Sequence, residues 1–125
     1  MSSRLRAAPA LAVALLLAAC VPAVNLPDDC DDAAVTRQAT LADNKLDPAT
    51  IEVCRDQHVT IEYTIEQDGV LHMHGYDDQV DATEVHAGDV IELEFDATHP
   101  GQFPIEVHTT EDAEADAGTF IVHER

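Results

Sequence analysis

Histidines are the residues in this sequence whose type and spacing could bind a metal ion. Five of the seven histidines lie between residues 70 and 108, and two of them, His72 and His74, form a His-x-His pair. In an extended strand, side chains two residues apart leave the same face with Cα atoms about 6.5–7 Å apart, so two imidazoles can reach one ion. Imidazole nitrogen suits Cu(II), Zn(II) or Ni(II). The alternative is that both histidines are half-exposed strand residues bonded to neighbouring carboxylates.

The same alternation restricts where this pair can point. Leu71 and Met73 share the opposite face, so His72 and His74 point outward if that apolar face packs into the core. Met73 is the only methionine beyond residue 1, and it offers the one thioether that reduced copper would prefer. Asp77 either orients a ligand histidine or begins the turn that follows the pair. The histidines expected to be structural or solvent-facing are His58, His86, His99 and His123.

Alternating apolar and polar residues predict the strands that must position the pair. This pattern runs through residues 59–65, 91–96 and 103–107, with acidic or threonine side chains on the polar face except at Pro104. Asp68-Gly69 predicts a hairpin turn, and Ala87-Gly88-Asp89 predicts another turn. Strands with one apolar and one acidic face are covered on one side only. The sequence therefore predicts an all-β sandwich or barrel of about seven short strands.

The N-terminal residues resemble a bacterial lipoprotein signal. Residues 1–19 combine two arginines with a short apolar run, and Leu17-Ala18-Ala19-Cys20 resembles a lipobox. Lipidation of Cys20 would anchor an exported chain on the periplasmic or cell-surface side of a membrane. In a bacterium with an outer membrane, Val21 after Cys20 favours that membrane by resemblance to lipoprotein sorting signals. The alternative is an ordinary secretory signal.

Residues 20–45 are predicted to form an irregular, acidic tether. Prolines and aspartates dominate its first half, and a short helix is expected over residues 33–41. The folded domain is then expected to span residues 46–125. Cys30 and Cys54 remain as an even pair in an exported chain, which predicts a disulfide worth about 3 kcal/mol on the chain-entropy estimate. Thiolate ligation of a metal by this pair is the alternative.

Acidic residues dominate the charge balance. Asp and Glu number 25 against 6 Lys and Arg, which gives a formal net charge of −19 with neutral histidines. Such a surface repels nucleic acid and attracts cations, so nucleic-acid binding is excluded. Adaptation to salt explains most of this charge, because carboxylates keep a protein soluble where electrostatic screening is short.

Several stretches together resemble the cupredoxin family. Residues 46–53 (LDPATIEV) resemble its opening strand, and His72 falls where the first copper-binding histidine follows the next strand. The segment Ala87-Gly88-Asp89 with its following strand, the segment 100–105 (PGQFPI), and residues 118–123 resemble later parts of the same fold. The resemblance covers roughly residues 46–124 and implies a cupredoxin-like Greek-key β-sandwich.

The same resemblance fails at the blue-copper ligands. A type 1 copper site needs a cysteine at the end of the strand after Pro-Gly, where this chain has Val107, and then a histidine and a methionine in the following loop. The loop over residues 109–117 has neither. The cupredoxin fold would bring His108 to the same end of the sandwich as His72. His108 is then the expected third ligand, with Glu111 or Asp112 as possible oxygen donors.

These observations predict an exported, membrane-anchored lipoprotein that is not an enzyme. We expect it to bind a metal ion, copper first or else zinc, through His72, His74 and His108, or to hand the ion on to a periplasmic protein partner. Blue-copper electron transfer is not expected. The alternative is a metal-free structural or protein-interaction module that kept the fold and lost the site.

Overall fold

The computed structural model describes Cys20, residues 25–111 and residues 114–125. Within these residues the chain forms strands and no helix, and hence no helix that could cross a membrane. The strands are β1 (Ala34–Ala42), β2 (Lys45–Asp47), β3 (Thr50–Cys54), β4 (His58–Ile65), β5 (Gly69–Met73), β6 (Thr83–Val85), β7 (Val90–Asp96), β8 (Gly101–His108) and β9 (Ala115–His123).

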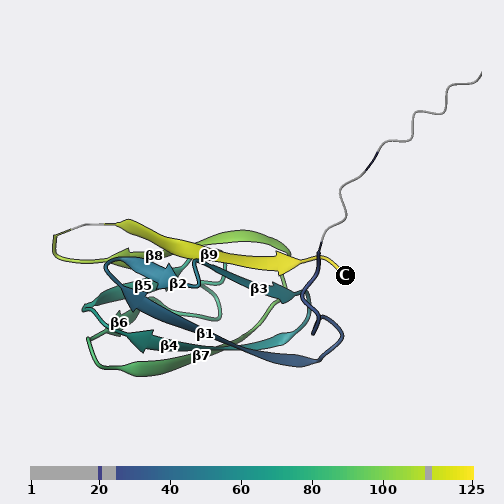
Figure 1. The fold of residues 1–125 in the computed structure, drawn as a ribbon, viewed down its shortest axis with the longest axis horizontal. Helices are drawn as coiled ribbons and strands as arrows, with labels where there is room; N and C mark the ends of the chain where they lie inside the picture. Colours follow the sequence, from purple (N-terminus) through teal and green to yellow (C-terminus); the bar gives the residue numbers. More distant parts are fainter. Residues whose placement is uncertain (1–19, 21–24, 112–113) are drawn as a thin grey trace, which may run out of the picture.

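The strands form two sheets that pack face to face as a sandwich (Figure 1). One sheet has the order β2-β1-β4-β7, and the other has the order β3-β9-β8-β5-β6. Most neighbours are antiparallel, but β1 pairs with β4 and β3 pairs with β9 in parallel. The predicted all-β sandwich is confirmed, with nine described strands in place of seven and with two mixed sheets.

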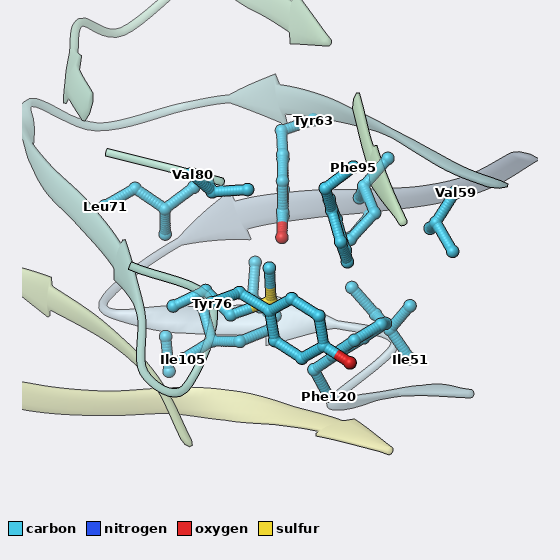
Figure 2. Close-up of a cluster of buried hydrophobic side chains, with 14 of the residues drawn as sticks. Ile51, Val59, Tyr63, Leu71, Tyr76, Val80, Phe95, Ile105 and Phe120 are labelled. Atoms are coloured by element: carbon cyan, nitrogen blue, oxygen red, sulfur yellow. The ribbon is translucent and has the colours of Figure 1, made fainter. Parts of the chain in front are cut away.

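The core lies between the sheets and follows the alternation seen in the sequence. In β4 every second residue from Val59 to Ile65 is buried, and the intervening residues face outward. Aromatic rings fill the centre, where Tyr76 packs against Phe95 and Phe120 with ring centroids 5.1 and 5.6 Å apart (Figure 2). Tilted and edge-to-face arrangements of this kind are favourable for aromatic rings. Leu71, Met73 and Ile105 join this core from the sheet that carries the candidate ligands.

The tether expected over residues 20–45 is wrong in its second half, and the short helix expected there is not formed. Residues 34–42 form β1, which lies between β2 and β4 inside a sheet. Val35, Ala39 and Leu41 are buried there, and parallel pairing with β4 gives the backbone its hydrogen-bond partners. Tertiary pairing therefore overrides the weak local helix preference. The folded domain begins before residue 34, so the expected boundary at residue 46 is also wrong.

The expected hairpin at Asp68-Gly69 is wrong as well. The strands on either side, β4 and β5, belong to different sheets, so this segment crosses from one sheet to the other. Asp68 accepts a hydrogen bond from the Ala87 backbone NH at 3.0 Å. A Cβ at Gly69 would lie 2.9 Å from Cγ2 of Val107 and 3.0 Å from the carbonyl oxygen of His108. Glycine is therefore required there for close packing between β5 and β8.

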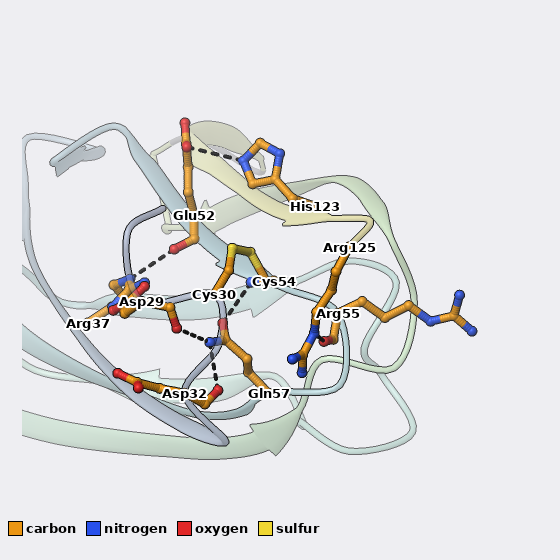
Figure 3. The surroundings of a disulfide bond; sticks show 10 residues. All are labelled: Asp29, Cys30, Asp32, Arg37, Glu52, Cys54, Arg55, Gln57, His123 and Arg125. Atoms are coloured by element: carbon orange, nitrogen blue, oxygen red, sulfur yellow. Dashed lines mark hydrogen bonds and ion pairs between the residues drawn. A yellow bond between two sulfur atoms is a disulfide. The ribbon is translucent and has the colours of Figure 1, made fainter. Parts of the chain in front are cut away.

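The segment before β1 is attached to the domain at several points (Figure 3). The predicted disulfide between Cys30 and Cys54 is present, with Cα atoms 5.3 Å apart. Arg37 forms a two-point ion pair with Asp29, with both N···O distances at 2.8 Å. Gln57 is fully buried, and its amide nitrogen donates to the carbonyl oxygens of Asp29 and Asp32 at 2.7 and 2.9 Å. The chain is thus fixed to the end of the sandwich from Asp29 onward.

We expect Gln57→Met to destabilise the protein by about 2–4 kcal/mol, because methionine has a similar size but leaves buried backbone groups without partners. These groups include the Cys54 NH, which donates to Gln57 Oε1 at 2.7 Å. Urea unfolding with the disulfide intact measures the effect. Gln38→Met is the matched control, since Gln38 is exposed. Equal stability of the two variants would contradict this role for Gln57.

Candidate metal centre

The candidate ligands lie on the outer face of the sheet that contains β5 and β8. These strands are antiparallel, and their register places Leu71 opposite Val107 and His72 opposite Glu106. Leu71 and Met73 are each 3% exposed and face the core, while both histidines of the pair are half-buried on the other side. The expectation from strand parity, that an inward Met73 turns the histidine pair outward, is therefore met.

Three histidines and one buried carboxylate meet at this face. The ring centroids of His72 and His74 are 4.3 Å apart, and those of His72 and His108 are 6.4 Å apart. Glu106 lies among them and is only 8% exposed. Its Oε2 atom is 2.6 Å from Nε2 of His74 and 3.7 Å from Nε2 of His108. This hydrogen bond raises the pKa of His74 and lowers the pKa of Glu106.

A second carboxylate reaches the cluster from the residue just before β9. Glu114 is exposed and hydrogen-bonds to the carboxyl group of Glu106, which raises the pKa of Glu114 above its usual value. Two hydrogen-bonded carboxyl groups do not readily both ionise, and His74 favours the ionised form of Glu106, so it is the pKa of Glu114 that rises. The register between β8 and β9 shifts at Glu106, where one extra residue of β9 forms a bulge. We call the set His72, His74, Glu106, His108 and Glu114 the histidine–carboxylate cluster.

Asp77 contacts both His72 and the turn that follows the histidine pair. One of its carboxylate oxygens bonds to Nε2 of His72, and the other accepts a hydrogen bond from the Gly75 NH at 3.2 Å. The bond to His72 lowers the pKa of Asp77. Gly75 has φ of +83°, and a Cβ there would overlap the ring of Phe103. The turn after the pair thus requires glycine, and it holds the carboxylate that orients His72.

The cluster contains two groups of potential metal ligands, one formed by His72, Glu106 and His108 and the other by His74, Glu106 and Glu114. Within each group, one potential ligand atom per residue lies within 4.8 Å of the others. The structure therefore brings together all three histidines predicted from the sequence. Sequence reasoning missed both glutamates, although Glu106 has the same strand parity as His108.

The other residues considered from the sequence belong to neither group where the structure describes them. Glu111 belongs to neither group, and Asp112 lies outside the described residues. Cys20 is exposed, while the signal segment 1–19 is outside the described residues. Elsewhere His58 bonds to Asp96 and His123 bonds to Glu52, at 2.8 and 3.2 Å. His86 lies 3.3 Å from Glu84, and the ring of His99 bonds to the Thr98 hydroxyl.

The fold is cupredoxin-like, as comparison with solved structures shows. A blue copper oxidase from Nitrosomonas europaea matches at 16% identity and TM-score 0.58, over 74% of this chain and 39% of that chain. A copper nitrite reductase from the same organism matches at 14% identity and TM-score 0.59, over 74% of this chain and 42% of that chain. Auracyanin from Roseiflexus castenholzii matches at 15% identity and TM-score 0.53, over 70% of this chain and 96% of that chain.

This likeness establishes the fold and no more. The chain spans about two fifths of the length of the two larger enzymes. No family model matches the sequence, and no curated protein sequence matches it.

The described residues do not fit the type 1 copper that the fold implies. Such a site uses a cysteine thiolate, two histidines and a weak axial methionine. Here Val107 occupies the buried end of β8, while Cys30 and Cys54 are joined in a disulfide at the other end of the sandwich. Met73 points into the core. The donor set on this sheet face is imidazole with carboxylate, which suits Cu(II) and Zn(II) rather than a thiolate–copper centre.

The ion pair between His74 and Glu106 predicts a pH window of extra stability for the metal-free protein. Because the pKa of His74 is raised in the fold, its contribution is complete below the ordinary value of 6.5 and is lost as pH rises through the raised pKa. Because the pKa of Glu106 is lowered, its contribution is complete above 4.5 and is lost as pH falls. The pair therefore stabilises the fold most between 4.5 and 6.5.

We expect Glu106→Gln to lower the melting temperature most within that window and less at about pH 9, where His74 is neutral. Thermal unfolding with a chelator present measures this difference. Glu94→Gln, which changes an exposed carboxylate on β7, serves as the matched control. A loss that is the same at both pH values would show that Glu106 acts through packing and not through its charge.

Proposed function

We propose that this domain binds a divalent transition-metal ion, copper first and zinc second, and hands it on. The observation that carries the proposal is the first ligand group, in which His72, Glu106 and His108 each offer a ligand atom within 4.8 Å of the others. Ligands on one tetrahedral ion lie about 3.5 Å apart, given metal–nitrogen and metal–oxygen distances of about 2.0–2.2 Å. Small side-chain rotations would therefore complete a site.

The surroundings of the group support binding of a cation that can be exchanged. Asp77 already holds the ring of His72, as an outer carboxylate holds a ligand histidine in many metal sites. The cluster lies on the outer face of a sheet, so an ion there would be accessible to solvent and to a partner. The net charge of −19 also raises the local concentration of cations. These features favour binding and transfer over catalysis.

We also propose that the protein is exported and anchored through a lipid on Cys20. The position of the cluster is consistent with this arrangement. The chain enters the sandwich at the end where Cys30 meets Cys54, and β8 ends at His108 at the opposite end (Figure 1). An anchor upstream of Cys30 would therefore leave the cluster facing away from the membrane, toward a soluble periplasmic protein partner.

A metal-free interaction module is the second candidate function. One observation favours it, namely that histidines throughout the described surface bond to carboxylates. His58 with Asp96 and His123 with Glu52 form such pairs outside the cluster. On this interpretation, the bonds of His72 and His74 to carboxylates are further examples of the same surface chemistry, and no ion is needed.

Titration with Cu(II) and with Zn(II) separates the two functions. We expect wild-type protein to bind an ion with submicromolar affinity, and we expect a variant with His72→Ala and His74→Ala to bind at least about a hundredfold more weakly, because ligand and orienting contacts are lost. Affinity should also fall as the solution is made acidic, since protons compete with the ion for the imidazoles. Calorimetry measures both effects.

The matched control carries His58→Ala and His86→Ala, which removes two exposed histidines that lie near carboxylates outside the cluster. This control is expected to bind like the wild type. Weak binding at many sites, with no difference between the two double variants, would show that the acidic surface merely collects cations. The metal-free module would then be the better description.

A further inference from the structure

The two ligand groups lie side by side and share one residue. His72 and His108 complete the first group, His74 and Glu114 complete the second, and Glu106 belongs to both. We propose that Glu106 bridges two metal ions, so that the histidine–carboxylate cluster is a dinuclear centre. This inference rests on the proposed function, because it adds a second ion to the site that would bind the first.

Glu106 has the position and the contacts that a bridging carboxylate needs. It lies on β8, which pairs with β5 on one side and with β9 on the other. Its Oε2 atom lies 2.6 Å from Nε2 of His74, in the second group, and 3.7 Å from Nε2 of His108, in the first group. A carboxylate has two oxygens and can direct one toward each ion, as in two-metal sites with ions about 3.5–4 Å apart.

The remaining ligands favour two ions over one. An ion held by His72, Glu106 and His108 would draw Glu106 away from the ring of His74, with which it forms a hydrogen bond at 2.6 Å. His74 and Glu114 would then remain next to the first ion without taking part in binding it. A second ion would use both of these residues together with the second oxygen of Glu106. The five side chains would all become ligands.

The chemistry of the two groups predicts the order of binding. The first group has two imidazoles and one carboxylate, and the second has one imidazole and two carboxylates. Nitrogen-rich sites bind Cu(II) more tightly than oxygen-rich sites do. Cu(II) should therefore occupy the first group before the second. The carboxylate of Glu114 would offset the charge added by the second ion.

Glu114→Gln tests the second ion without removing a ligand of the first. Glu114 is exposed, so its substitution is expected to leave the fold intact. We expect the wild-type protein to bind about two ions in successive steps when titrated with Cu(II) or Zn(II) alone, and the variant to bind about one. Asp116→Asn is the matched control, because it changes an exposed carboxylate of β9 that belongs to neither group.

Electron paramagnetic resonance of the protein loaded with excess Cu(II) provides a second measurement. Two Cu(II) ions joined by one carboxylate couple magnetically, so the wild type should show less signal than its copper content predicts. Glu114→Gln should show the full signal of one isolated ion.

The outcomes distinguish this inference from the proposed function. One ion in the wild type, unaffected by Glu114→Gln but lost with His72→Ala and His74→Ala, would overturn the bridge and leave the proposed function intact. A second ion that persists in Glu114→Gln would also overturn the bridge, because that ion would bind elsewhere. Binding that none of these substitutions changes would overturn the proposed function itself.

Discussion

Leu71 faces Val107 and His72 faces Glu106 across the antiparallel pair of β5 and β8. Because side chains alternate along a strand, this single register places the apolar residues in the core and the potential ligands on the outer face. A slip of one residue would exchange the two faces and bury the histidines. The free energy of burying Leu71, Met73 and Val107 therefore also holds the candidate ligands in place. The cluster depends on the core behind it.

Two local features keep that register. Gly69 allows β5 to approach Val107 and the carbonyl group of His108 more closely than a side chain would permit. At the other end of β5, the backbone NH of His74 donates to the carbonyl oxygen of Pro104 at 3.0 Å, so pairing continues past Met73. Both features constrain the backbone, and the histidines gain defined positions without being buried themselves.

The molecule combines a cupredoxin-like sandwich with a different donor chemistry. The thiolate chemistry of blue-copper proteins needs a free cysteine near the end of β8, and this chain places Val107 there and joins its two described core cysteines in a disulfide. Imidazoles and carboxylates gather instead on the outer face of the same sheet. Fold and site are thus separable, because alternate residues of one strand serve the core and the surface independently.

The sequence alone determined the β-sandwich and the disulfide between Cys30 and Cys54, and it tied an outward direction of the histidine pair to burial of Leu71 and Met73. Each follows from local alternation or from cysteine count, which need no knowledge of distant neighbours. Residues 34–42 and Asp68-Gly69 were predicted wrongly, because their structure depends on which strand lies beside them. Glu106 and Glu114 were missed for the same reason. Acidic residues are so numerous here that only strand pairing between residues distant in sequence shows which carboxylates meet His72, His74 and His108.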